Sequence, residues 1–227
     1  MTSIAVQLQA VRARIGAACL AAGRDPRDVA LLAVSKSFGP EAVRQAHGAG
    51  QTAFGENYLQ EAVGKMAVLA DLPLQWHCIG PIQSNKTRLV AEHFDWAQTV
   101  DRLKIAERLQ EQRPPHLAPL QVCIQVNIDG GATKSGVAPD EVMGLALAVA
   151  RLPRLRLRGL MCIPEPQPDF ESMKTTFLRA RALYDSVRGA GLPLDTLSMG
   201  MSADLEAAVH AGSTMVRIGS ALFGARA

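Results

Sequence analysis

The stretch VALLAVSKSFGPEAVRQAHGAGQTAFGEN, residues 29–57, decides the fold because it contains one complete strand–helix–strand unit. It begins with a short run that is apolar on both faces, and from Pro40 it continues as a helical segment that ends in glycine. It closes on a second short apolar run, residues 52–57. Strands that are apolar on both faces and joined by helices belong to parallel sheets. The unit therefore predicts a parallel sheet.

The same alternation of short apolar runs and helical segments continues through the rest of the chain. Eight such strands in slightly under the usual ~250 residues predict a (β/α)8 barrel of the TIM type with an extra N-terminal helix. An open doubly wound sheet is the alternative. We expect one domain over residues 1–227, because a chain of this length with 48% hydrophobic residues can bury one core. The strand candidates are 29–36, 52–57, 74–80, 94–100, 120–127, 157–164, 194–200 and 214–220, and between them lie helical segments 40–50, 58–71, 83–94, 101–113, 139–153, 169–191 and 202–212.

Charge and composition argue against a nucleic-acid or membrane protein. The net charge is +3, from 24 basic and 21 acidic residues, and no window combines dense Lys/Arg with aromatic residues. The N-terminal segment places arginines among apolar residues at helical spacing, so we expect a soluble, cytoplasmic chain without a signal peptide or membrane span. The cysteines are widely spaced, which predicts buried free thiols and no metal site. They are Cys19, Cys78, Cys123 and Cys162.

Polar residues at the carboxyl ends of the predicted strands mark the expected active site, because this fold builds its sites there. A lysine at the rim of an apolar barrel, next to a second cation, has a lowered pKa and can attack a carbonyl to form a Schiff base. The alternative is a lysine that reaches solvent or pairs with Glu56. The strand-end residues are Lys36, Glu56, Asn57, His77, Asn127, Met161, Ser198 and Arg217.

The C-terminal segment LSMGMSADLEAAVHAGSTMVRIGSALFG, residues 197–224, supplies what an anionic group needs. Ser202 is expected to cap the following helix, and Gly219 with Ser220 forms a small-residue turn that a phosphate could approach closely. Phosphate sites after strands 7 and 8 recur in this fold. An ordinary cap and a loop glycine are the alternatives. Together with Lys36, these features describe pyridoxal 5′-phosphate (PLP), an aldehyde that carries a phosphate.

Seven motifs between residues 29 and 224 resemble, in order, the pyridoxal-phosphate homeostasis protein family of the YggS type, also called PLP-binding proteins. The last motif is also similar to the corresponding segment of alanine racemase barrels. Two departures are small: SKSFGP replaces the commoner Thr-Lys after the lysine, and Cys78 stands where a larger apolar residue is usual. The motifs are AVSKSF (33–38), FGENYLQEA (54–62), WHCIGPIQSNK (76–86), TKSGV (133–137), GLMCIPEP (159–166), LSMGMSADLEAAV (197–209) and VRIGSALFG (216–224).

The resemblance implies an alanine-racemase-like barrel of fold type III, with PLP held as an internal aldimine on Lys36. It further implies phosphate contacts from the two C-terminal turns, with Arg217 near the pyridine nitrogen. Members of the family are regarded as carriers or regulators of PLP in vitamin B6 and amino-acid balance. The expected cofactor-binding residues are Lys36, Asn57, His77, Met161, Ser198, Ser202, Arg217, Gly219 and Ser220, and no catalytic residue is assigned.

Several of these residues have structural alternatives. His77 could instead be a hydrogen-bonded barrel histidine, Met161 a core residue, and Asn57 a helix cap. Lys86, early in a helix, could attract an anion or be a solvated side chain. Lys134, on a glycine-rich loop, could make a second, transient contact with the aldehyde.

Two functional hypotheses from different classes follow. The first is a protein that carries or regulates PLP, and the second is a PLP-dependent amino-acid racemase or related enzyme. Arg217 has only donors, so a pyridine nitrogen facing it stays unprotonated and the ring is a weak electron sink. The chain stops at FGARA, after the last strand, so we expect no second domain to supply the second acid or base that racemisation needs.

The carrier hypothesis is therefore preferred. A barrel that binds another phosphate without a covalent bond is a third possibility. The expected partners are PLP and, as acceptors, apo forms of PLP-dependent enzymes, and we expect the chain to be a monomer.

Overall fold

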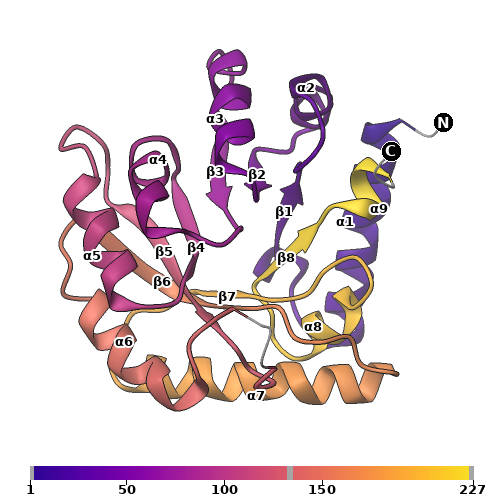
Figure 1. Cartoon of the computed structure of the whole chain (residues 1–227). Helices are drawn as coiled ribbons and strands as arrows, with labels where there is room; N and C mark the ends of the chain where they lie inside the picture. Colours follow the sequence, from indigo (N-terminus) through magenta and orange to yellow (C-terminus); the bar gives the residue numbers. More distant parts are fainter. Residues whose placement is uncertain (1–2, 132–134, 225–227) are drawn as a thin grey trace.

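Eight parallel strands form a closed barrel in the order β1 to β8 (Figure 1). The computed structural model describes residues 3–131 and 135–224. The predicted (β/α)8 barrel is confirmed, and the alternative of an open doubly wound sheet is wrong, because β1 pairs in parallel with both β2 and β8. The strands are β1 Ala30–Val34, β2 Ala53–Glu56, β3 Gln75–Cys78, β4 Trp96–Val100, β5 Leu120–Val126, β6 Leu155–Cys162, β7 Thr196–Ser198 and β8 Met215–Ile218.

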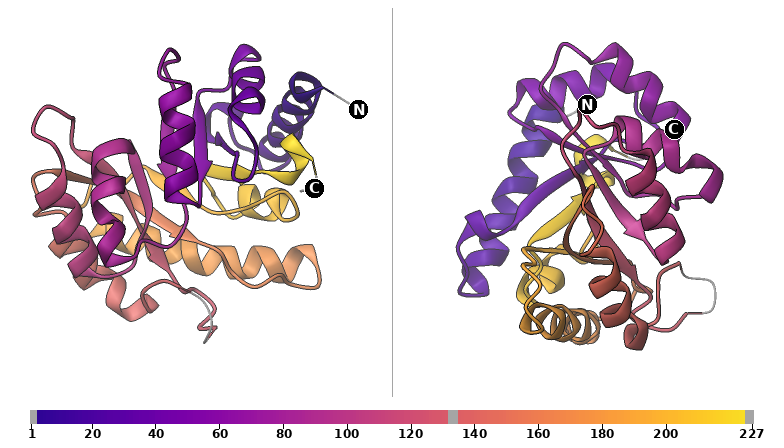
Figure 2. Two further views of the ribbon diagram at one scale, coloured as in Figure 1. Left: turned by 45° about the horizontal axis from the view of Figure 1, so that its top comes forward. Right: turned by 90° about the vertical axis from the view of Figure 1, so that its left-hand side faces the viewer.

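Helices alternate with the strands and surround them, as both views of Figure 2 show. Local sequence signals set several of their starts: Pro40 occupies the first turn of α2, and the Asp169 side chain accepts the Ser172 N–H at the start of α7. The helices are α1 Ile4–Ala21, α2 Pro40–Gly48, α3 Leu59–Val68, α4 Thr87–His93, α5 Leu103–Gln112, α6 Val142–Val149, α7 Phe170–Gly189, α8 Leu205–His210 and α9 Ser220–Phe223, with 3₁₀ helices η1 Pro26–Asp28, η2 Ser84–Lys86 and η3 Pro139–Glu141.

Helix α1 is the predicted extra helix and packs beside α2, α8 and α9 (Figure 1). Within the described residues it is the one helix long and apolar enough, by length and composition, to cross a membrane. Its buried residues, such as Leu8 and Ile15, belong to the main core cluster, and Arg14 forms a bidentate pair with Glu206 of α8 at 2.5 and 2.7 Å. These contacts make α1 part of the helical layer around the barrel.

The apolar residues separate into an outer shell and the barrel interior. Most of the core fills the space between the strands and the surrounding helices. The barrel interior holds two smaller apolar clusters. Because side chains alternate along a strand, Lys36 follows Leu32 and Val34 on the inner face of β1. The interior clusters are Leu32, Val34, Ile79 and Met215, and Trp96, Cys123 and Met161.

The four cysteines are buried and free, as predicted. Burial raises the pKa of Cys78, Cys123 and Cys162 to about 12, because the thiolate form would lose its hydration. At neutral pH these three side chains are therefore protonated and behave as small apolar residues.

Candidate cofactor-binding site

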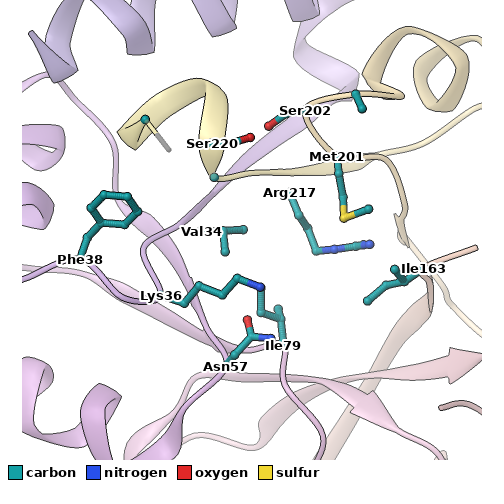
Figure 3. Close-up of a pocket in the computed structure, with 13 residues that line it drawn as sticks. Val34, Lys36, Phe38, Asn57, Ile79, Ile163, Met201, Ser202, Arg217 and Ser220 are labelled. Atoms are coloured by element: carbon teal, nitrogen blue, oxygen red, sulfur yellow. The ribbon is translucent and has the colours of Figure 1, made fainter. Parts of the chain in front are cut away.

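A cavity of about 520 Å³ opens at the carboxyl end of the barrel (Figure 3). Most of the residues that the sequence predicted for the site lie together on its wall. Lys36, Asn57, Ser202, Arg217, Gly219 and Ser220 all line it. The other lining residues are Val34, Phe38, Ile79, Ile163, Met201, Ala203 and Gly224.

Lys36 extends into the cavity beside Asn57 and Ile79, as Figure 3 shows. The next residue, Ser37, has φ 68°, a left-handed conformation that is uncommon for a residue other than glycine. The Phe38 N–H donates to the Ser35 carbonyl at 3.0 Å and closes the turn. The lysine therefore sits at the start of a tight turn that leaves the inner face of β1.

Four residues, which we call the lysine-loop network, hold this turn: Ser35, Glu56, Glu61 and Lys65. The Lys65 ammonium donates to Glu56 Oε1 at 2.6 Å, to the Ser35 carbonyl at 3.0 Å and to Glu61 Oε1 at 3.3 Å. The Ser35 hydroxyl also donates to Glu56 Oε1, at 2.6 Å. The Ser37 N–H donates to Glu61 Oε1 at 3.0 Å. Ser35 is thus held by the buried Glu56–Lys65 pair, and Ser37 by Glu61, which is itself paired with Lys65.

The Glu56–Lys65 pair is almost completely removed from water. The side chains of Lys65 and Glu56 are 3% and 0% exposed. Burial raises the pKa of Glu56, and the hydrogen bond from Lys65 opposes that rise. Glu56, which the sequence offered as a possible partner of Lys36, accepts hydrogen bonds at Oε1 from Lys65 and Ser35. Glu56 Oε2 is buried and has no hydrogen-bond partner among the described residues.

Arg217 reaches the cavity from β8, and its guanidinium lies across from Lys36 (Figure 3). It belongs to a second group, which we call the barrel-core network: Arg217, Ser198, Gln98 and His77. Arg217 Nη1 donates to Ser198 Oγ at 2.8 Å, and Nη2 donates to the Cys162 carbonyl at 2.9 Å. Burial lowers the pKa of Arg217. Its described hydrogen-bond partners are neutral oxygens, in contrast to the ion pair beside Lys36.

Three predicted site residues lie one layer below the cavity. His77, Met161 and Ser198 are fully buried and do not line it. On the same inward face and two residues further along, Ile79 and Ile163 line it in place of His77 and Met161. Burial lowers the pKa of His77 to about 3, which keeps the ring neutral at pH 7. His77 is therefore a hydrogen-bonded histidine inside the barrel, and Met161 is a core residue, which are the structural alternatives raised from the sequence.

The prediction that Ser202 caps a helix is wrong. The N-cap of α8 is Asp204, and the Asp204 side chain also accepts the Met201 N–H at 2.5 Å. The turn needs Gly200, whose φ is +95° and where a Cβ would lie 2.4 Å from the Ala208 side chain. Ser202 Oγ instead accepts the N–H of Ala221 in α9 at 3.4 Å. Its hydroxyl joins the two C-terminal turns at one end of the cavity.

Asn57 lies in the cavity wall and is not a helix cap, because Tyr58 occupies the N-cap position of α3. Its backbone is so close to Gly80 that a Cβ there would lie 2.3 Å from the Asn57 carbonyl. Asn57 Oδ1 is buried and has no hydrogen-bond partner among the described residues. A buried polar atom beside a cavity is a natural contact point for a ligand or an ordered water.

The two other lysines raised by the sequence are not part of this wall. Lys86 ends η2 and does not line the cavity. Lys134 lies outside the described residues. Within residues 3–131 and 135–224, no three His, Cys, Asp or Glu side chains gather in a way that could hold a metal ion.

Sequence reasoning missed Lys65 and Gln98. Lys65 had one available signal, because it lies four residues after Glu61 in a helix that follows Glu56, which predicts an ion pair on one helix face. Gln98 lies in the middle of a predicted buried strand, FDWAQTV. A lone amide in such a run needs a partner, yet the sequence does not say which strand supplies it.

Comparisons with known proteins show the family of this chain. The family model of the alanine racemase N-terminal domain matches residues 6–227. The pyridoxal phosphate homeostasis protein of Pseudomonas aeruginosa is 62% identical over 226 residues, which cover 100% of this chain and 97% of that protein. The chain belongs to the pyridoxal phosphate homeostasis protein family.

Solved structures support the same family assignment. PipY of Synechococcus elongatus, solved with PLP bound, is 36% identical, with a TM-score of 0.85 over 97% of this chain and 100% of its own. An alanine racemase of Clostridium difficile has a TM-score of 0.73 at 15% identity, over 87% of this chain and 53% of its own. That second likeness shows the shared fold alone.

Proposed function

We propose that this chain binds PLP covalently through Lys36 and serves as a carrier or regulator of the PLP supply. The observation that carries the proposal is the cavity itself, in which one amine, one buried guanidinium and two hydroxyls face a common space. Membership of the pyridoxal phosphate homeostasis protein family supports the same reading. The carrier role goes beyond binding and rests on the chemistry of the lining residues.

The lining residues fit the functional groups of PLP. Lys36 offers a primary amine for the aldehyde, and Arg217 offers donors for the ring nitrogen. Figure 3 shows the Ser202 and Ser220 hydroxyls together at the end of the cavity away from Asn57, where a phosphate would find donors. The buried, unpartnered Asn57 Oδ1 marks a polar contact that the protein itself does not satisfy.

When bound, PLP supplies an electrophilic aldehyde. Lys36 would hold the group through its primary amine, which can condense with an aldehyde. Ser202 and Ser220 would hold the phosphate through their hydroxyl donors. Arg217 can donate to the ring nitrogen and cannot accept a proton from it.

The same lining favours holding PLP over turning over amino acids. Among the described residues on the cavity wall, the titratable side chains are Lys36 and Arg217. Racemisation requires proton transfer on both faces of the substrate, and a guanidinium is a poor acid and base at neutral pH. The competing racemase hypothesis is tested by incubating the PLP-loaded protein with single L- and D-amino acids in deuterated water. Sustained α-proton exchange or inversion would replace the carrier proposal.

The binding proposal is tested by titrating PLP into three proteins and recording absorption spectra. Wild type and Lys86→Ala should show the band of a lysine-bound PLP at one equivalent, whereas Lys36→Ala should not. Lys86 is the matched control because it lies outside the cavity wall. Equal bands in Lys36→Ala and wild type would contradict the assignment.

The proposed setting is cytoplasmic, with the chain as a monomer that delivers PLP to apo enzymes. Delivery is measured by mixing the loaded protein with an apo PLP-dependent enzyme and following recovery of that enzyme's activity. The control is the same amount of free PLP, and both mixtures contain an amine that traps free PLP. If the loaded protein restores the enzyme's activity no faster than free PLP does, direct delivery is rejected. Light scattering after size exclusion checks the monomer.

A further inference from the structure

A continuous chain of hydrogen bonds crosses the barrel interior below the cavity. It starts where Arg217 Nη1 donates to Ser198 Oγ at 2.8 Å, and Ser198 Oγ lies 2.7 Å from Gln98 Oε1. Gln98 Nε2 lies 2.9 Å from His77 Nδ1, and His77 Nε2 lies 3.0 Å from Gln75 Oε1. The contacts link β8, β7, β4 and β3 across the barrel.

The hydrogen bonds of this chain all run in one direction, which starts at the arginine and passes through the Ser198 hydroxyl. A guanidinium only donates, so Ser198 Oγ must accept from Arg217 and has its own hydrogen left for Gln98. The Gln98 carbonyl oxygen takes that hydrogen, so its NH₂ group faces His77. His77 Nδ1 must then accept, which places the imidazole proton on Nε2, toward Gln75.

Gln98 is the middle member and the one that makes the chain continuous. It is fully buried; its amide oxygen accepts from Ser198, and its nitrogen donates to His77 and also to Met215 Sδ at 3.2 Å. The ends have additional contacts: Arg217 Nη2 donates to the Cys162 carbonyl, and the His77 ring stacks on Trp96 with centroids 4.9 Å apart. A hydroxyl alone would not orient the guanidinium, because it can rotate; its orientation is set by the oxygen of Gln98.

We propose that Gln98 is a positioning residue for Arg217, which it orients through Ser198 while His77 holds Gln98 from behind. The ligand side of this proposal rests on the proposed function, in which Arg217 faces the ring nitrogen of PLP. Donors near that nitrogen tune the electronic properties of the cofactor. The spectrum of bound PLP therefore depends on an amide that does not touch it.

The first test uses the protein without PLP. Nitrogen chemical shifts of ¹⁵N-histidine-labelled protein report which ring nitrogen carries the proton, and His77→Gln identifies the His77 signals by their disappearance. Wild type should show the proton on Nε2. Gln98→Glu keeps the side-chain shape but offers only acceptors, so it should move the His77 proton to Nδ1 or leave both nitrogens protonated. A wild-type ring protonated on Nδ1 would overturn the inference.

The second test uses PLP. Gln98→Leu should shift the absorption maximum of bound PLP and weaken PLP binding on the order of tenfold, because Ser198 no longer orients the guanidinium. The matched control is Gln125→Leu, which removes a buried glutamine of β5 bonded to the Ser135 carbonyl and not to the network. The control should leave the absorption maximum unchanged. If Gln98→Leu does not fold, Gln98→Glu carries the same spectral test.

Failures of this inference and of the proposed function are distinguishable. If wild type has the predicted His77 proton but forms no PLP adduct, the network stands and the proposed function fails. If PLP binds through Lys36 but neither Gln98 variant changes its spectrum, the positioning role of Gln98 is wrong and the proposed function stands. Equal spectral shifts in Gln98→Leu and Gln125→Leu would also overturn it.

Discussion

The two sides of the cavity are built from opposite kinds of polar contact. On the β1 side, the lysine-loop network fixes the turn around Lys36 with a buried ion pair between Glu56 and Lys65. On the β8 side, the barrel-core network holds Arg217 through neutral groups. A buried charge that loses its partner is far more costly than a neutral group that does. The lysine side should therefore be sensitive to charge, and the arginine side to the direction of hydrogen bonds.

The largest effect is expected when the ion pair is broken. Lys65→Met leaves Glu56 buried without its partner, so the free energy of unfolding should fall by about 3–5 kcal/mol. Urea denaturation measures it. The control Lys104→Met changes an exposed lysine of α5 and should cost less than about 0.5 kcal/mol. A loss below about 1 kcal/mol for Lys65→Met would remove the contrast between the two sides.

The barrel-core network should affect how the free energy of unfolding depends on pH. Burial lowers the pKa of His77 to about 3 from 6.5, so below pH 6.5 the unfolded chain binds a proton that the folded protein does not. The contribution of neutral His77 to the free energy of unfolding is fully present above pH 6.5. It falls by about 1.4 kcal/mol per pH unit as the pH is lowered toward 3.

The variant His77→Gln isolates this term. Between pH 6 and pH 4, the unfolding free energy of this variant should fall by about 2.5 kcal/mol less than that of the wild type. His93→Gln, at an exposed position of α4, should leave the wild-type slope unchanged. Equal slopes in wild type and His77→Gln would show that His77 is not held neutral.

A smaller effect is expected at the C-terminal turns. Ser202→Ala should weaken PLP binding by on the order of 2 kcal/mol, because one charge-assisted hydrogen bond to the phosphate is lost. Pyridoxal, which has no phosphate, serves as the matched ligand and should bind both proteins equally. Isothermal titration of both ligands measures the difference. Equal weakening for both would mean that Ser202 does not contact the phosphate.

The smallest effect is expected at the outer member of the lysine-loop network. Glu61 is 39% exposed and lies 3.3 Å from Lys65, so Glu61→Gln should lower the free energy of unfolding by less than about 1 kcal/mol. The new amide oxygen can still accept the Ser37 N–H. A loss as large as that of Lys65→Met in the same urea experiment would show that the stabilising partner of Lys65 is the exposed carboxylate of Glu61 and not Glu56.

The sequence predicted the barrel and the inward position of Lys36 because both depend on periodicity, and it predicted six of the thirteen residues that line the cavity. Alternation along β1 is enough to place Lys36 on the inner face, and the number of strand–helix repeats is enough to predict an eight-stranded barrel. The layer of each residue was harder to predict. His77 and Met161 lie on the predicted inward faces of their strands. We expected them at the cavity, but the residues that line it stand two positions further along each chain segment, at Ile79 and Ile163.

Other features depend on contacts that no local pattern reveals. Ser202 resembles a cap by its position before α8, yet Asp204 occupies the N-cap position and Ser202 contacts α9. Gln98 and Ser198 are separated by a hundred positions in sequence and meet only because the barrel closes. Local signals predict elements, whereas networks across the barrel require the folded structure.

The central claim, that Lys36 is the residue that binds PLP, is tested most directly by chemical trapping. The wild-type protein is loaded with one equivalent of PLP, reduced with borohydride, digested and mapped by mass spectrometry. The account predicts that the pyridoxyl group is found on Lys36. A group found chiefly on Lys65, Lys86 or Lys134 would contradict it.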